Sequence, residues 1–138
     1  MKYKKIGNKY FVRLQRGEKV IETLTNFLFK KRVFAAQIVA VGAFSHATLG
    51  YFSVKKRKYF YKKFKDVEAT AIIGNVSSLN GKSFIHAHAV LGRHDFTSAA
   101  GHLKEATVSA TFEGVITASK TRIKRKLDPV TGLNLWDV

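Results

Sequence analysis

Three of the five histidines are spaced in a way that could bind a metal ion. His86 and His88 lie two residues apart in the apolar stretch 84–91, and residues two apart on a β-strand point to the same face of a sheet. His102 follows Gly101 after a loop long enough to return the chain. Three neutral imidazoles with one open position are typical of a catalytic zinc site. We therefore predict that His86, His88 and His102 bind Zn²⁺, although a His-x-His pair alone is also common as two polar strand residues.

Few other residues have the spacing of a reactive site. Glu105 lies three residues beyond His102 and could act as a general acid or base, or orient a metal ligand; the alternative is an exposed charge at the end of an element. His46 is a weaker metal-ligand candidate, and His94 is expected in a loop. A short polar stretch could line a pocket or simply mark a strand-to-turn transition: Asn75, Ser77 and Ser78.

An α+β fold is expected to position these residues. Apolar residues from position 18 onward fall on one helical stripe, formed by Val20, Ile21, Leu24, Phe27 and Leu28. Strands are predicted at 10–14, 34–41, 47–52, 59–64, 67–73, 84–91 and 107–117, with a tight turn at Asn80-Gly81. The expectation is a mainly antiparallel sheet of about seven strands with one main helix packed on it.

The length of 138 residues suits a single domain spanning 1–138. Its C-terminal segment, residues 119–138, is basic and ends in apolar residues that can dock on the body: Leu133, Leu135 and Trp136. The chain contains no cysteine, so a metal site must use other ligands. We find no signal peptide and no apolar run long enough to span a bilayer, and expect a cytoplasmic protein without membrane contact.

The charge is strongly unbalanced, with 25 Lys and Arg against nine Asp and Glu, giving a net charge of +16. Such an imbalance favours an anionic partner, although a solvated basic face is the alternative. Two clusters are the candidate nucleic-acid contacts: Lys55, Lys56, Arg57, Lys58, Lys62, Lys63 and Lys65 in the first, and Lys120, Arg122, Lys124, Arg125 and Lys126 in the second. Tyr59, Phe60 and Tyr61 interleave the first cluster and could stack on unpaired bases or pack under a hairpin.

Several motifs, taken in order, resemble the plants and prokaryotes conserved (PPC) domain: Gly42-Ala43-Phe44-Ser45, 47–52, Gly74-Asn75-Val76-Ser77, 84–92 and Gly101-His102-Leu103. The resemblance extends over roughly residues 8–137. It implies a compact α+β fold and a homotrimer. That fold is similar to those of acetolactate decarboxylase and a zinc-dependent ester hydrolase, both with three-histidine zinc sites, which favours metal binding by the same three histidines here. The AT-hook of plant members, Arg-Gly-Arg-Pro, is absent from this sequence.

Two functions remain open from the sequence. The first is a trimer that binds DNA or RNA without sequence preference and carries a three-histidine metal site. The second is a zinc-dependent hydrolase or lyase acting on a small anionic substrate, which the positive field would concentrate. A trimeric scaffold with structural histidines is a third interpretation.

Overall fold

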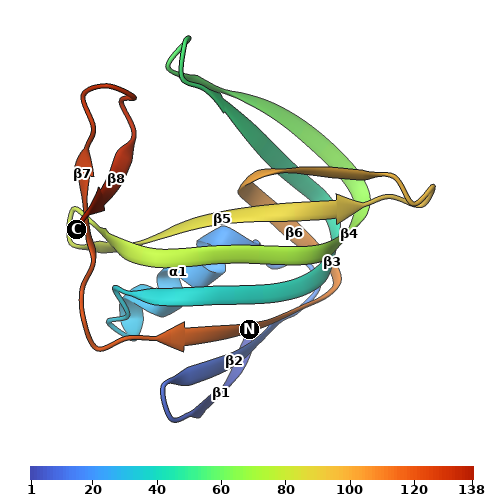
Figure 1. Cartoon of the computed structure of the whole chain (residues 1–138). Coiled ribbons are helices and arrows are strands. Elements are labelled where there is room, and N and C mark those ends of the chain that lie inside the picture. Colours follow the sequence, from blue (N-terminus) through green and yellow to red (C-terminus); the bar gives the residue numbers. More distant parts are fainter.

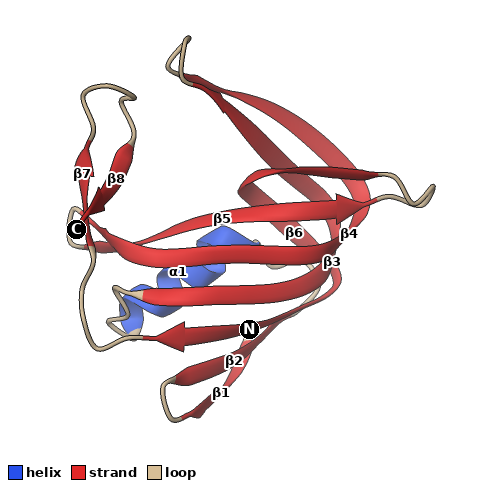
Figure 2. Cartoon of the chain, in the orientation of Figure 1, coloured by secondary structure: helices blue, strands red, loops and turns tan.

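One helix and eight strands make up the fold (Figure 1, Figure 2), as seen in a computed structural model that describes residues 1–138. The helix α1 spans Val20–Lys30. The strands are β1 (Lys2–Ile6), β2 (Lys9–Leu14), β3 (Ala36–Ser53), β4 (Lys58–Leu79), β5 (Lys82–Gly92), β6 (Ser98–Ala118), β7 (Lys124–Leu127) and β8 (Asn134–Asp137). The predicted α+β class with a mainly antiparallel sheet is confirmed, with eight strands in place of about seven.

The long central strands form a closed cycle of antiparallel pairs. Strand β3 pairs with β4, β4 with β5, β5 with β6, and β6 with β3. The only parallel pairing between named strands joins β4 and β7 at Ser78 and Lys124. Because β6 bends from β5 onto β3, residues near its start are brought opposite the end of β5. This bend brings His102 opposite His88.

The helix covers one face of the sheet, and the core lies between them (Figure 2). The apolar stripe predicted for the helix is buried, with Val20, Leu24, Phe27 and Leu28 all inside. On β5, the buried residues Ile85, Ala87 and Ala89 alternate with more exposed ones. This period of two assigns one face of β5 to the core and the other to the histidines.

Several predicted element boundaries are wrong. The predicted strands 34–41 and 47–52 are joined in one strand, β3, which begins at Ala36 and continues through residues 42–46 with shifts of register. Likewise 59–64 and 67–73 join in β4. The loop expected before His102 is shorter, because β6 begins at Ser98, and His102 lies within this strand. Strand β1 has no counterpart among the predicted strands, because all five of its residues are exposed and its sequence does not alternate between apolar and polar positions.

Two hairpins rise from the same side of the body in Figure 1. One joins β3 to β4, and the first basic cluster occupies its turn and the start of β4. The other joins β7 to β8 in the C-terminal segment. Arg57 at the first tip donates a hydrogen bond of 2.9 Å to the Pro129 carbonyl of the second. No helix of the structure is long and apolar enough to cross a membrane.

Candidate metal centre and basic surface

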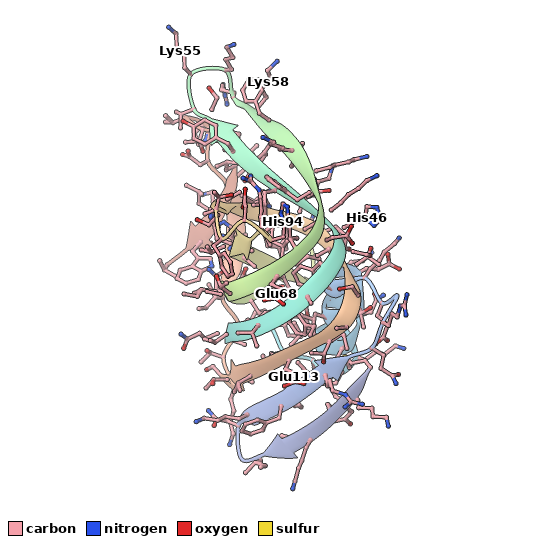
Figure 3. All side chains as sticks on the ribbon, turned by 90° about the vertical axis from the view of Figure 1, so that its right-hand side faces the viewer. His46, Lys55, Lys58, Glu68, His94 and Glu113 are labelled. Atoms are coloured by element: carbon pink, nitrogen blue, oxygen red, sulfur yellow. The ribbon has the colours of Figure 1, made fainter.

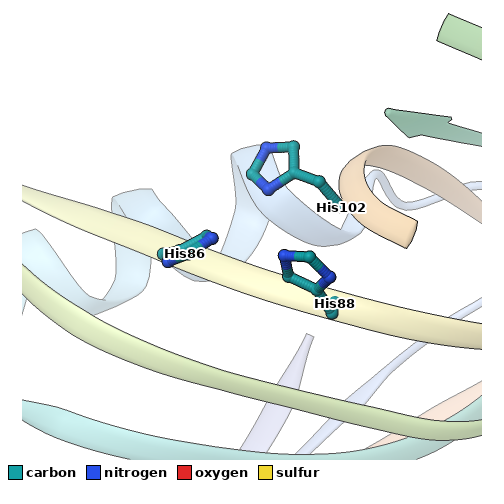
Figure 4. Close-up of side chains that lie close together, drawn as sticks. All are labelled: His86, His88 and His102. Atoms are coloured by element: carbon teal, nitrogen blue, oxygen red, sulfur yellow. The ribbon is translucent and has the colours of Figure 1, made fainter. Parts of the chain in front are cut away.

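His86, His88 and His102 come together on the sheet face opposite the core (Figure 4). His86 and His88 project from β5, and His102 lies on β6 directly opposite His88 in the strand register. The candidate ligand nitrogens of the three rings all lie within 4.8 Å of one another. Their ring centroids are 5.3–5.7 Å apart. The expected same-face arrangement and the convergence of His102 are confirmed.

Two glycines allow this close approach of strands. A Cβ on Gly101 would lie 2.9 Å from the carbonyl oxygen of Gly50, so a side chain there would separate β6 from β3 just before His102. A Cβ on Gly50 would lie 3.0 Å from the rings of Tyr59 and Tyr61. Gly50 pairs with His102 in the strand register. Beside it, the ring centroids of Tyr59 and His102 lie 5.1 Å apart. The tyrosine therefore forms a wall of the histidine cluster.

The local environment favours neutral imidazoles. Burial, followed by repulsion from His86 and His88, lowers the pKa of His102 from 6.5 to about 4. Burial also lowers the pKa of His86, with smaller contributions from His88 and Arg125. Metal ions bind the neutral form of histidine, so these directions keep the two rings ready to act as ligands near neutral pH.

The buried Nδ1 atom of His102 has no hydrogen-bond partner. A buried polar atom without a partner is costly and calls for an explanation. A metal ion bound by the cluster through this nitrogen would supply the missing partner. The donor set, three imidazoles and no cysteine, fits zinc. The observed residues therefore fit the predicted metal.

A cavity of about 260 Å³ lies beside the cluster. His86 and His102 line one part of it, and Arg125 another. The remaining walls come from β4, β5 and the C-terminal hairpin: Tyr59, Phe84, Gly132, Leu133, Asn134 and Leu135. The C-terminal segment is thus a wall of the candidate site, which its sequence does not indicate.

Glu105 lies outside the histidine cluster. Its carboxylate accepts hydrogen bonds from the backbone N–H groups of Ile21 at 2.8 Å and Glu22 at 3.1 Å. These groups form the first turn of α1, whose N-cap residue Lys19 supplies no side-chain cap. A carboxylate here satisfies unpaired donors and complements the helix dipole. The structure gives Glu105 a helix-capping contact instead of the expected position beside the metal ligands.

His46 and His94 are not part of the cluster either. Figure 3 shows His46 on β3 and His94 in the β5–β6 loop, below the tip of the β3–β4 hairpin. In the polar stretch on β4, Asn75 lines a cavity as one of the two alternatives expected, and all three residues also contact the C-terminal segment. Asn75 and Ser77 accept hydrogen bonds from Arg125, and Ser78 accepts one from Arg122. These contacts attach the C-terminal segment to the sheet.

The first basic cluster is exposed along the β3–β4 hairpin, with Lys55 and Lys58 at its tip (Figure 3). The ammonium groups of Lys56 and Lys58 lie 5.5 and 5.1 Å from the Phe60 ring centroid. Phe60 and Tyr61 are themselves exposed by 44% and 47%. The aromatic residues therefore do not all pack beneath the hairpin: Tyr59 turns to the histidines, and Phe60 remains open to solvent.

The second basic cluster contains exposed lysines and two arginines that make contacts within the protein. Lys120, Lys124 and Lys126 are exposed. Arg122 lies with its guanidinium carbon 3.7 Å from the Phe34 ring centroid and donates to Ser78. Arg125 is partly buried, 4.7 Å from the Phe84 centroid, and three of its donors form hydrogen bonds within the protein. The two arginines make structural contacts that a count of basic residues does not distinguish.

Fold and site together define an α+β domain with a three-histidine cluster and a basic surface. The chain belongs to the Plants and Prokaryotes Conserved (PCC) domain family, whose model matches residues 1–120. This confirms the resemblance to the PPC domain drawn from the sequence motifs. No curated protein matches the chain.

Solved structures agree with this assignment. A proposed DNA-binding protein of Bacteroides thetaiotaomicron is 35% identical, with 99% of this chain and 96% of that chain covered and a TM-score of 0.95. A metal-containing protein of Archaeoglobus fulgidus is 33% identical, with 99% and 98% covered and a TM-score of 0.86. Acetolactate decarboxylase of Bacillus subtilis shares the fold more distantly, at 14% identity with 83% and 54% covered and a TM-score of 0.60.

Proposed function

We propose that this protein binds nucleic acid without sequence preference through its basic hairpins and carries a zinc ion on its three histidines. The observation that supports nucleic-acid binding is the near absence of acidic partners for its positive charge. Of 25 Lys and Arg residues, only Lys19 forms an ion pair, with Glu22; the other pair joins the N-terminus to Glu18. The unpaired cations are available to phosphate groups. The similar Bacteroides protein is described as a proposed DNA-binding protein.

The chemistry of the hairpin favours phosphate contact over base reading. Seven of its residues between 55 and 65 are basic, and six of these seven are lysine. Lysine is a flexible point charge, whereas the bidentate recognition of guanine depends mainly on arginine. Contacts of this kind position a protein on nucleic acid without carrying sequence information. The affinity should therefore fall steeply with salt and depend little on base sequence.

The test compares two variants that remove the same charge. Lys55, Lys56, Lys58 and Lys63 are changed together to alanine, which leaves the hydrogen bond of Arg57 with Pro129 intact. The control changes four exposed lysines on β1 and β2: Lys2, Lys4, Lys5 and Lys9. Labelled duplex and single-stranded oligonucleotides are titrated at low and moderate salt. The hairpin variant should bind at least about tenfold more weakly and with a shallower salt slope, because each phosphate that is no longer neutralised lowers the slope by about 0.9 on duplex DNA.

The two possible failures are distinct. No binding by the wild-type protein at low salt would exclude the nucleic-acid function. Equal weakening in the hairpin variant and the β1–β2 control would show that net charge alone attracts the oligonucleotide and that the hairpin is not the binding surface.

The histidine cluster supports the metal part of the proposal. His86, His88 and His102 would be the protein ligands, and the bound ion would supply a Lewis acid that polarises an oxygen or lowers the pKa of water. The Archaeoglobus relative is described as metal-containing. Metal analysis of untagged protein should find about one zinc per chain in the wild type, the content of a single site, and His88→Ala should abolish it. Wild-type protein that is empty after exposure to zinc would exclude the site.

A small metalloenzyme is the second candidate function. The cavity of about 260 Å³ beside the histidines favours it, because a purely structural metal site does not need an adjoining cavity. In this interpretation Arg125 and the basic surface would attract an anionic substrate. A screen of small anionic esters and keto acids with zinc-loaded protein tests this candidate, with His88→Ala as the inactive control.

We also propose that the chain assembles as the homotrimer that the family resemblance implies. An exposed apolar row crosses the sheet on the face away from α1, with successive residues paired in register: Phe11, Val115, Val39 and Ile73. Val39 and Ile73 are exposed by 50% and 61%. An apolar row of this kind is typical of an interface between subunits.

Light scattering should give about three times the 15.5 kDa chain mass, and Val39→Lys should shift the protein toward the monomer. A wild-type monomer at micromolar concentration would contradict this.

A further inference from the structure

We propose that the cavity between the histidine cluster and Arg125 binds a short-chain carboxylate, with the carboxylate on Arg125 and the other end of the molecule beside His86 and His102. This inference rests on the proposed metal centre for the role of the histidine end. The arginine end rests on contacts within the chain and can be tested separately.

Arg125 is a partly buried cation without an acidic partner. Neither of the two ion pairs in the structure includes it. All its hydrogen bonds go to neutral oxygens: its Nε donates to Ser77 Oγ at 2.6 Å, its Nη1 to the Asn134 carbonyl at 2.7 Å, and its Nη2 to Asn75 Oδ1 at 3.0 Å. Arginine remains charged in proteins, so the site holds a positive charge that the protein does not neutralise.

The arginine has donors left for a ligand. A guanidinium carries five N–H donors, and three are used by the hydrogen bonds to Ser77, Asn134 and Asn75. Those hydrogen bonds, together with the Phe84 ring 4.7 Å from the guanidinium carbon, fix the plane of the group. A fixed, planar guanidinium matches the two oxygens of a carboxylate. Since little side-chain freedom remains to be restricted on binding, the arrangement is preorganised for such a ligand.

The cavity limits the size and character of the ligand. Its volume of about 260 Å³ is below the usual range of about 300–1,000 Å³ for pockets that hold drug-sized molecules. Phe84, Leu133 and Leu135 give it apolar walls. A short aliphatic chain fits such walls, whereas a free phosphate would leave them without a contact. These features favour a small carboxylate over an inorganic oxyanion.

Calorimetric titration of zinc-loaded protein with butyrate tests the inference, with butyramide as the uncharged analogue and inorganic phosphate as the competing anion. Butyrate should bind, and butyramide and phosphate should bind at least tenfold more weakly. Arg125→Gln should reduce butyrate affinity at least tenfold while retaining its zinc. The matched control is Arg122→Gln, which removes an arginine that also contacts a serine and an aromatic ring but does not line the cavity. It should bind within about twofold of the wild type.

A second variant protects the test against a folding defect in Arg125→Gln. Leu133→Trp fills the cavity from its apolar wall and leaves the arginine hydrogen bonds in place, and it should also weaken butyrate binding at least tenfold. The inference is overturned if butyramide or phosphate binds as well as butyrate, or if both cavity variants bind butyrate like the wild type. Failure of the metal centre would be seen separately as absence of zinc, and the metal-free protein would still show the dependence of butyrate binding on Arg125.

Discussion

Between residues 55 and 65 the chain carries seven basic side chains, and between 120 and 126 it carries five. In the sequence these segments look alike, but their cations are used differently. The lysines of the β3–β4 hairpin are exposed and make no ion pair. In the C-terminal segment, Arg122 and Arg125 are held by serine hydroxyls and aromatic rings. Charge that is engaged in internal contacts stabilises and shapes a site, whereas exposed charge is available to a partner.

The largest expected effect concerns the internal role of Arg125. Changing Arg125→Ala removes three hydrogen bonds and leaves the fully buried Ser77 without its partner. We expect a decrease of about 2–3 kcal/mol in the free energy of unfolding. Chemical denaturation measures this decrease. Arg57→Ala in the hairpin, where one exposed hydrogen bond is removed, should cost less than about 0.5 kcal/mol. Equal decreases in the two variants would remove the distinction between the segments.

A smaller effect separates the two kinds of cation within the C-terminal segment. Lys126→Ala and Arg122→Gln each remove one charge from an exposed residue, but only Arg122 makes contacts within the chain, where it lies on Phe34 and donates to Ser78. Lys126→Ala should reduce the salt slope of oligonucleotide binding by about 0.9, the contribution of one neutralised phosphate. Arg122→Gln should change it by less than half of that. The opposite order would show that the engaged arginine still contacts phosphate.

The sequence predicts the local strand pattern well but not the long-range pairing of strands. The period of two around His86 and His88 indicates a shared face, and that face is opposite the buried Ala87. The pairing of His102 with His88 depends on the bend of β6 between two partner strands, which no local pattern encodes. The position of Arg125 likewise depends on hydrogen bonds to residues 48 and 50 positions away in the chain. Local alternation was therefore predictable, and long-range register was not.

The role of Glu105 shows the same limit. Its spacing from His102 is compatible with a catalytic group, but one extra residue on β6 relative to β3 lies between Leu103 and Glu105 in the register. Its carboxylate meets the helix N-terminus, 83 and 84 residues away in sequence. A cap supplied by a distant strand leaves no signal in the helix itself, where the N-cap position holds Lys19. The sequence pattern therefore places the carboxylate near the histidines but cannot select its partner.

The partly buried histidine cluster should also make the stability depend on pH, which is the smallest effect expected here. In metal-free protein the pKa of His102 is about 4 when folded and near its ordinary 6.5 when unfolded. Between these values the unfolded chain binds more protons, so the free energy of unfolding rises with pH across this window and falls as the solution is acidified from pH 6.5 toward 4. Because the ring is only partly buried, solvent reduces the cost of charging it, and we expect the free energy of unfolding to decrease by under about 1 kcal/mol between pH 7 and 5.

Denaturation of metal-free protein at several pH values measures this decrease. His102→Gln should flatten this part of the profile, whereas Lys55→Ala in the hairpin should leave it unchanged. A profile that His102→Gln does not alter would assign the acid sensitivity to other groups.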